Sequence, residues 1–94
     1  MPFQFEWDPA KAIANFAKHG VSFEEARDVF DDPLSQTVDD VAHTLEEPRC
    51  WTIGMSLSGQ LLVVIHTDRG DTIRIIGARR AIGREQHDYE ENPN

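Results

Sequence analysis

Cysteine and long apolar runs are both scarce in this sequence. The 94 residues include a single cysteine, Cys50, which excludes an internal disulfide and fits a reducing, cytoplasmic setting. No stretch approaches the roughly 20 consecutive apolar residues that span a bilayer. The opening MPFQFEWDP has neither the basic nor the apolar region of a signal peptide. We therefore predict a cytoplasmic protein that does not enter a membrane.

The chain is also too short for two domains. Its 94 residues, of which 39% are hydrophobic, predict one globular domain over residues 1–94, with a flexible tail at 91–94. A domain of this size buries only about 60–65% of its unfolded surface, so contacts with a partner would add appreciably to its stability.

Positive charge is scarce overall, but it is unevenly distributed. The formal net charge is -8 at pH 7. Residues 1–47 hold three basic and eleven acidic residues, whereas residues 48–94 hold six arginines, six acidic residues and no lysine. Between Arg49 and Arg84 the local charge is +4. The net acidity argues against binding long duplexes through bulk electrostatics, while the planar fork of arginine suits a small phosphate-gripping site.

Familiar catalytic and metal-binding motifs are absent from the sequence. It contains no Walker loop, no dinucleotide-binding glycine pattern, no HExxH and no GxSxG. The segment DDVAH (39–43) combines carboxylates with a histidine, but it lacks a recognised metal-ligand spacing and is expected to be a solvated loop. Cys50 has no motif around it and is expected to be buried. We therefore predict no cofactor and no metal site.

Apolar periodicity and capping residues predict an α+β domain, with two N-terminal helices and a C-terminal helix packed on an antiparallel sheet of three to five strands. Asp8 and Pro9 suit a helix start, Gly20 suits a helix stop, and Ser22 forms a capping box with Glu25. The expected elements are a strand at 3–7, helices at 8–20 and 22–30, a short strand around 36–38 within a mobile acidic segment at 34–48, strands at 49–55, 60–67 and 72–79, and a helix at 84–91.

Short glycine-containing turns predict antiparallel hairpins and set an expected register for the last three strands. Tight closure places Arg49 opposite His66, and His66 opposite Ile73. One expected face carries Arg49, Trp51, Ile53, Leu62, Val64, His66, Ile73 and Ile75, and the other carries Cys50, Thr52, Gly54, Leu61, Val63, Ile65, Arg74 and Ile76. The small residues of the second face would let helices approach the sheet closely.

Three arginines stand in or just after the last expected strand. Arg74 lies mid-strand between isoleucines, where a charge needs a partner or a function. A β-bulge at Gly77 would shift side-chain parity by one and bring Arg79 to the face of Arg74. With Arg80, these side chains fit either a phosphate clamp or ordinary ion pairs with the carboxylates of the first half, and the residues alone leave both interpretations open.

Three further residues are candidates for chemistry. His66 ends an apolar strand, where it fits a general acid or base, because imidazole titrates near neutrality, and equally fits a buried structural histidine. Glu85 and Tyr89 lie four residues apart on the last expected helix and share a face that could meet the arginines. Tyr89 also fits a role in packing that helix onto the sheet.

Three blocks of the sequence form a specific combination: KHGVSFEEA, HTDRGDTIRIIGARRA and YEE. They lie within residues 5–33, 52–81 and 84–91, and together these segments closely resemble the BrnT family of toxins. The resemblance implies a RelE-like fold and the toxin half of a bacterial type II toxin–antitoxin pair. It implies an endoribonuclease that cuts RNA, inhibits translation and arrests growth.

The same resemblance implies a protein partner. This would be a BrnA antitoxin with a ribbon-helix-helix DNA-binding part, which neutralises the toxin and represses the shared promoter together with it. Contact with DNA would then be indirect, through the antitoxin. We expect a hetero-oligomer with the antitoxin, with a dimer of the toxin as a further option.

A ribonuclease of this kind would need no metal, because RNA carries its own nucleophile, the 2′-OH, beside the scissile phosphate. The arginines would clamp the phosphate, while a histidine or carboxylate accepts the proton, leaving a cyclic phosphate and a 5′-OH. The predicted catalytic residues are Arg74, Arg79, His66, Glu85 and Tyr89, and the predicted RNA-binding residues are Arg49, Arg80 and Lys18. The alternative is a catalytically inactive acidic binding module that partners a DNA-binding antitoxin.

Overall fold

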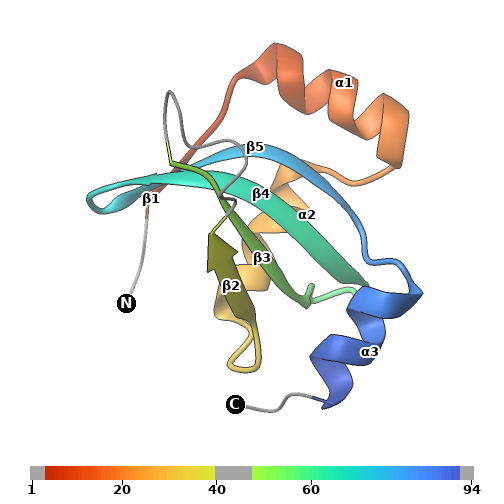
Figure 1. Cartoon of the computed structure of the whole chain (residues 1–94). Coiled ribbons are helices and arrows are strands. Elements are labelled where there is room, and N and C mark those ends of the chain that lie inside the picture. The colour runs from red at the N-terminus through yellow and green to blue at the C-terminus, as the bar shows by residue number, and fades with distance from the viewer. Residues whose placement is uncertain (1–3, 40–47, 92–94) are drawn as a thin grey trace.

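The computed structural model describes residues 4–39 and 48–91 and shows an α+β domain built on one five-stranded sheet (Figure 1). The elements are β1 (Gln4–Glu6), α1 (Pro9–His19), α2 (Phe23–Arg27), the 3-10 helix η1 (Asp28–Asp31), β2 (Gln36–Asp39), β3 (Cys50–Met55), β4 (Leu61–Arg69), β5 (Thr72–Arg80) and α3 (Gly83–Glu91). Every expected element is present, including the short strand around 36–38. Residues 40–47 of the predicted acidic segment and residues 92–94 of the predicted tail lie outside the described residues.

The sheet is mixed, so the prediction of a purely antiparallel sheet is wrong. The strand order is β1-β5-β4-β3-β2, and β1 runs parallel to β5 whereas all other neighbours are antiparallel. A parallel pair needs a long connection between its strands. Here the elements from α1 to β4 form that connection between β1 and β5. A three-residue strand such as β1 carries no sequence signal for the edge it joins or for its direction.

The predicted helix caps are confirmed. The Asp8 carboxylate accepts a hydrogen bond from the Ala10 amide at 2.9 Å, and the Ser22 hydroxyl accepts one from the Glu25 amide at 3.0 Å. Gly20 ends α1 in the left-handed region, with φ at 72°, which glycine adopts without steric cost. These caps fix where the first two helices begin and where α1 ends.

The last helix begins without a serine or threonine. Instead the Glu85 carboxylate, in the first turn of α3, accepts a hydrogen bond from the Ile82 amide at 2.9 Å. This contact is the reciprocal half of a capping box, because the acidic side chain reaches back to the residue before the helix. Glu85 therefore holds the start of α3 in place.

The core lies between the sheet and the pair α2 and η1. It contains Val21, Phe23, Ala26, Val29, Leu62, Val64, Ile73, Ile75 and Ala78. Gly54 allows η1 to approach β3, since a Cβ at this position would lie 2.8 Å from a Val29 methyl group. The predicted helix arrangement is only partly confirmed: α1 and α3 contact strands of the sheet, but no residue of either helix is buried, and only α2 and η1 cover the core. Figure 1 shows α2 behind the strands, α1 beside β5 and α3 beyond the ends of β3 and β5.

Helix α1 lies along the edge of β5, past the point where the short β1 ends. There the side chain of Asn15 pairs with the strand as a backbone would. Its amide nitrogen donates to the Ala78 carbonyl at 2.9 Å, and its oxygen accepts from the Ala78 amide at 3.2 Å. This side chain satisfies backbone groups of β5 that pair with no other strand in the described part of the chain.

The predicted strand register is wrong, although the predicted bulge is confirmed. Cys50 lies opposite His66, and His66 lies opposite Ile75. The turn between β3 and β4 takes in five residues, closed by a hydrogen bond from the Ser56 amide to the Gln60 carbonyl, rather than the two that we expected. A shift of one residue moves every side chain of a strand to the opposite face.

The bulge lies in β5. Ile65 pairs with Gly77 and His66 with Ile75, so Ile76 is an extra residue on β5 next to the predicted glycine. Among the described residues, no helix is long and apolar enough to cross a membrane.

Candidate functional site

The two faces of the sheet separate the predicted site residues. We call the face that carries Trp51, Ile53, Val63, Arg74 and Arg79 the open face. We call the face that packs on α2 and η1, with Thr52, Val64, His66, Ile75 and Ala78, the covered face. These sets follow from the strand register, in which directly paired residues point to the same side. Arg74 and Arg79 share a face, as predicted, whereas His66 lies on the other one.

Arg79 is held by two partners on the open face. Its guanidinium donates two hydrogen bonds to the Glu85 carboxylate, at 2.9 and 2.8 Å, and its central carbon lies 5.5 Å from the centre of the Trp51 ring. The paired carboxylate raises the pKa of Arg79 against the opposing effect of burial. The same hydrogen bonds lower the pKa of Glu85 against burial, with help from the Ile82 amide. Both groups are therefore charged at neutral pH.

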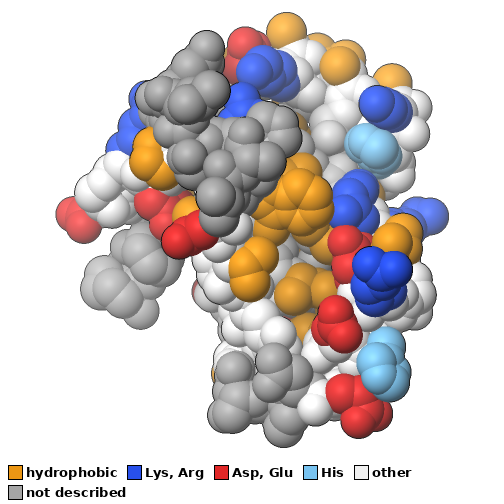
Figure 2. Space-filling model, viewed as in Figure 1, with side chains coloured by type: hydrophobic (Ala, Val, Ile, Leu, Met, Phe, Trp, Pro, Cys, Tyr) orange, Lys and Arg blue, Asp and Glu red, His pale blue; other side chains and the backbone are white. Residues whose placement is uncertain are grey.

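A groove adjoins this pair. It has a volume of about 180 Å³ and is lined by Gln36, Val38, Trp51, Ile53, Val63, Glu85 and Asp88. Its floor is apolar and its rim toward α3 is acidic, with Arg79 over the Trp51 ring beside it. Figure 2 shows hydrophobic side chains gathered in the middle of this view, bordered by acidic and basic side chains on the side of α3.

Arg74 lies too far along β5 to complete a single clamp with Arg79. The strand register pairs Arg74 with Thr67 and Arg79 with Val63. Four residues along β4 correspond to about 13 Å at roughly 3.3 Å per residue. Arg74 instead pairs with the Glu6 carboxylate at 3.2 Å, which Arg69 also approaches at 3.7 Å. The charge in the middle of β5 thus has a partner from β1.

Tyr89 anchors α3 to the turn after η1. Its hydroxyl donates to the Asp32 carboxylate at 2.5 Å. Burial and this carboxylate raise the pKa of Tyr89 to about 12. Burial alone would raise the pKa of Asp32, but hydrogen bonds from Tyr89 and from the amides of Met55 and Leu34 outweigh it and leave that pKa lowered. These contacts agree with the role of Tyr89 in packing the last helix onto the domain.

The three predicted RNA-binding residues lie apart from one another. Arg49 is half-buried just before β3, and Lys18 is exposed in the last turn of α1. Arg80 pairs with Leu62 in the register, so it points to the side opposite Arg79, and its guanidinium donates to the Gln60 side chain at 2.8 Å. Arg80 therefore does not share the face of the Arg79–Glu85 pair.

His66 belongs to a hydrogen-bonded relay on the covered face and is only 1% exposed. Its Nδ1 lies 2.7 Å from an Asp68 carboxylate oxygen, and its Nε2 lies 2.7 Å from the Thr52 hydroxyl, which in turn lies 2.7 Å from the Thr37 hydroxyl. Burial lowers the pKa of His66, although Asp68 opposes that shift. A neutral ring then donates from Nδ1 to Asp68 and accepts from Thr52 at Nε2. Both ring nitrogens are occupied.

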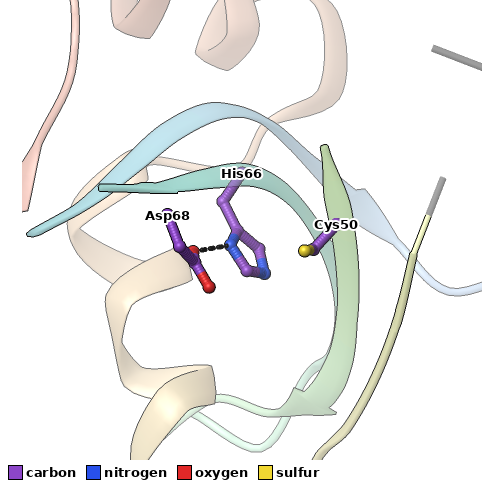
Figure 3. A group of neighbouring side chains, drawn as sticks. All are labelled: Cys50, His66 and Asp68. Carbon is purple, nitrogen blue, oxygen red and sulfur yellow. Dashed lines mark hydrogen bonds and ion pairs between the residues drawn. The ribbon is translucent and has the colours of Figure 1, made fainter. Parts of the chain in front are cut away.

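Cys50 and Asp68 complete a cluster with His66 that sequence reasoning missed. Figure 3 shows Cys50 on β3, with its sulfur toward the imidazole ring, and His66 and Asp68 on β4. One donor atom from each of the three residues lies within 4.8 Å of the others. Burial raises the pKa of the Cys50 thiol, and so do Asp68 and Asp39. The pattern His-x-Asp on one strand was available as a signal, but the expected register put Cys50 on the face opposite His66.

The open face combines an aromatic ring, a paired arginine and an ionised carboxylate beside an apolar groove. A ring of this kind can stack on a nucleobase, a guanidinium can bind a phosphate, and a carboxylate can accept a proton. The covered face offers buried polar groups that are all satisfied within the described part of the chain. The first arrangement fits recognition of a phosphate-containing ligand, whereas the buried polar groups of the second do not face solvent.

Comparisons with known proteins agree with the fold. Residues 7–85 match a family described as the ribonuclease toxin BrnT of type II toxin–antitoxin systems. The crystal structure of the Brucella abortus ribonuclease toxin BrnT is similar to this chain, with a TM-score of 0.66 and 23% sequence identity over 86% of this chain and 99% of that one. No curated protein sequence matches the chain.

Proposed function

Because this chain belongs to the BrnT family of ribonuclease toxins of type II toxin–antitoxin systems, we propose that it is an endoribonuclease that cleaves RNA through the 2′-OH next to the scissile phosphate. The observation that most supports the proposal is the Arg79–Glu85 pair, stacked on Trp51 at the rim of the apolar groove. Each of these three residues serves one need of the reaction. Arg79 can bind the phosphate, Glu85 can accept the proton, and the Trp51 ring can stack on a nucleobase.

In the proposed reaction a base of the RNA stacks on Trp51, and Arg79 turns from Glu85 to the scissile phosphate. Glu85 then accepts the proton of the 2′-OH as its oxygen attacks phosphorus. The bond to the 5′-oxygen breaks, and that oxygen takes a proton from water. The products are a cyclic phosphate and a 5′-OH end. Arg79 stabilises the charge that grows on the phosphoryl oxygens, where an ionic hydrogen bond is strongest.

Other predicted residues take supporting roles in this proposal. Arg74, about 13 Å along the strand from Arg79, lies at a distance that suits a flanking phosphate of the same RNA. Tyr89 positions Glu85 indirectly, because its bond to Asp32 holds α3 against the body of the domain. His66 is assigned no proton transfer, since it is buried on the covered face with both ring nitrogens hydrogen-bonded.

In this proposal the protein works in the cytoplasm. A BrnA-like antitoxin with a ribbon-helix-helix DNA-binding part neutralises it. The two proteins form a hetero-oligomer that represses its own promoter, with DNA contacted by the antitoxin. The charge distribution supports such a pairing. Residues 1–47 carry a net charge of -8 in a chain whose second half is neutral overall, so the first half complements a basic partner.

RNA cleavage by the purified chain tests this proposal. Wild type and Arg79→Ala are incubated with a mixed-sequence RNA in the presence of EDTA, and the ends of the products are mapped. Arg80→Ala is the matched control, since this neighbouring arginine points to the other side of the sheet. We expect cyclic phosphate ends from wild type and the control, and a loss of about 10²–10³-fold in rate for Arg79→Ala.

Two results would contradict the proposal. Equal rates for Arg79→Ala and wild type would remove Arg79 from the reaction. The second result is a wild-type chain that binds its antitoxin but cleaves no RNA and leaves growth unchanged when expressed alone. That result would establish the alternative of an inactive acidic binding module.

A further inference from the structure

Four side chains that bind metals in other proteins meet at the solvent end of the covered face. Asp39, Cys50 and His66 are successive register partners across β2, β3 and β4. Asp68 follows His66 by two residues on β4 and so points to the same side. Directly opposite residues of neighbouring strands have Cβ atoms about 4.5–5.5 Å apart. The sheet itself therefore gathers a thiol, an imidazole and two carboxylates.

The distances within this group suit a small cation. The donor atoms of Cys50, His66 and Asp68 lie within 4.8 Å of one another, and Asp39 Oδ1 lies 3.7 Å from Cys50 Sγ. Bonds from zinc to sulfur, nitrogen and oxygen are about 2.0–2.3 Å long, which places tetrahedral ligands about 3.3–3.7 Å apart. The shortest separation, 2.7 Å between His66 and Asp68, widens by a small rotation of Asp68, whose side chain is 53% exposed.

The imidazole is also held as a ligand would be. A metal-bound histidine usually uses its second ring nitrogen for a hydrogen bond that fixes the ring. Here Nε2 lies 2.7 Å from the Thr52 hydroxyl, and the edge of the ring packs against Phe30, with ring centres 5.0 Å apart. This leaves Nδ1 directed at Asp68, and Figure 3 shows the Cys50 sulfur facing the same ring.

We propose that Cys50, His66, Asp68 and Asp39 bind one zinc-type divalent transition-metal ion. A thiolate together with an imidazole selects such a borderline ion over the hard ions magnesium and calcium, which prefer oxygen ligands. On binding, Cys50 releases its proton. The His66 proton moves from Nδ1 to Nε2, where it is donated to Thr52, and the Thr52–Thr37 hydrogen bond then runs from Thr52 to Thr37. The His66–Thr52–Thr37 hydrogen bonds keep their partners and reverse their direction, while bonds from Nδ1 and Asp68 to the ion replace the His66–Asp68 hydrogen bond.

The ion would be structural. It joins β2, a four-residue edge strand, to β3 and β4. It lies on the face opposite Arg79 and Trp51, so it takes no part in the proposed cleavage of RNA. The inference is therefore independent of the proposed function, and either can fail without the other.

Cobalt titration of the reduced full-length chain tests the site, after removal of metal with a chelator. We expect tetrahedral Co²⁺ bands together with a thiolate-to-cobalt charge-transfer band, both saturating at one equivalent and both displaced by Zn²⁺. Binding should release about one proton per ion, measured with a pH indicator in weak buffer. Zn²⁺ should also raise the midpoint of thermal unfolding.

Matched variants locate the ion. Cys50→Ser should abolish the charge-transfer band, Asp68→Asn should weaken binding at least tenfold, and Thr52→Val should weaken it roughly 10–100-fold through the loss of the hydroxyl that orients His66. His87→Gln, which removes an exposed histidine of α3, should change nothing. Circular dichroism of each metal-free variant checks that it is folded.

Three outcomes would overturn the proposal. These are the absence of saturable binding by the folded, reduced wild type, a charge-transfer band that survives Cys50→Ser, and loss of binding in His87→Gln. Ribonuclease assays in chelator are not affected by any of these outcomes.

Discussion

The two faces of the sheet use the same strands for opposite purposes. On the covered face the polar groups of Thr52 and His66 are buried and hydrogen-bonded to neighbours within the chain. On the open face Arg79 keeps 26% of its side chain exposed and Glu85 keeps 22%, beside an apolar groove. Burial and complete pairing make the first face a framework, whereas partial exposure leaves the second face able to exchange an internal partner for a ligand.

This comparison teaches that a charged pair is not by itself a sign of stability or of function. Glu6 binds Arg74 through a single close contact at 3.2 Å, while Glu85 binds Arg79 through two. A bidentate pair of this kind also presents the geometry that a phosphate would find. The Arg79–Glu85 pair differs from the Arg74–Glu6 pair in lying beside the apolar groove.

The largest expected effect separates the faces by stability. Phe23→Ala on the covered side should lower the free energy of unfolding by about 3–5 kcal/mol, because it empties a fully buried site. Trp51→Ala on the open face should cost clearly less, since Trp51 is only half-buried, and should impair RNA cleavage instead. Urea unfolding of both variants measures the difference. Equal losses of stability would remove the distinction between the faces.

A second prediction sharpens the role of the open face. Glu85→Gln should lower the rate of RNA cleavage by about 10²–10⁴-fold, the range for loss of a general base. The amide oxygen can still accept the Ile82 hydrogen bond, so α3 should remain, as far-ultraviolet circular dichroism would show. RNA affinity should fall little, because Arg79 remains and the charged carboxylate that competes with phosphate for its guanidinium is gone. Unchanged cleavage would exclude Glu85 as the base.

A smaller effect is expected where the open face is anchored. Tyr89→Phe removes the hydroxyl that donates to Asp32, and hydrogen bonds to charged groups contribute about 1.5–3 kcal/mol. At this partly exposed position we expect the low end of that range in urea unfolding. Cleavage should fall less than in Glu85→Gln, because Tyr89 acts through the position of α3. A loss of activity as large as that of Glu85→Gln would instead make Tyr89 a direct participant.

The smallest expected effect concerns pH. Burial lowers the pKa of His66, so the folded protein binds fewer protons than the unfolded chain between that lowered pKa and the ordinary value of about 6.5. Stability therefore rises with pH across this window and is lost as the pH falls through it. His66→Gln should flatten this part of the curve. Unfolding midpoints between pH 5 and pH 7.5, in chelator, would measure it, and an unchanged slope would contradict the assignment.

Much of the fold followed from local signals. The caps at Asp8, Gly20 and Ser22 and the alternation within the strands depend on nearby residues, and the structure confirms them. The placement of Arg74 and Arg79 on one face also followed, since a bulge beside Gly77 was predicted. The family resemblance carried by the arginine-rich block agrees with the family match over residues 7–85.

The remaining features depend on turn length, which the sequence left open. A five-residue turn in place of a two-residue one placed Cys50 beside His66, and so the cluster on the covered face was not foreseen. The parallel pairing of β1 with β5 is equally nonlocal, and it supplies Glu6 as the partner of Arg74. Long-range pairing of this kind is not encoded in the spacing of neighbouring residues.

The Asn15 side chain that pairs with β5 has a consequence for the solution behaviour of the protein. An unpaired strand edge is a template onto which the strand of another molecule can add, and this leads to aggregation. Here two hydrogen bonds from a single amide occupy that template at Ala78. Asn15 thereby blocks this part of the edge of β5 against the addition of a strand from a second molecule.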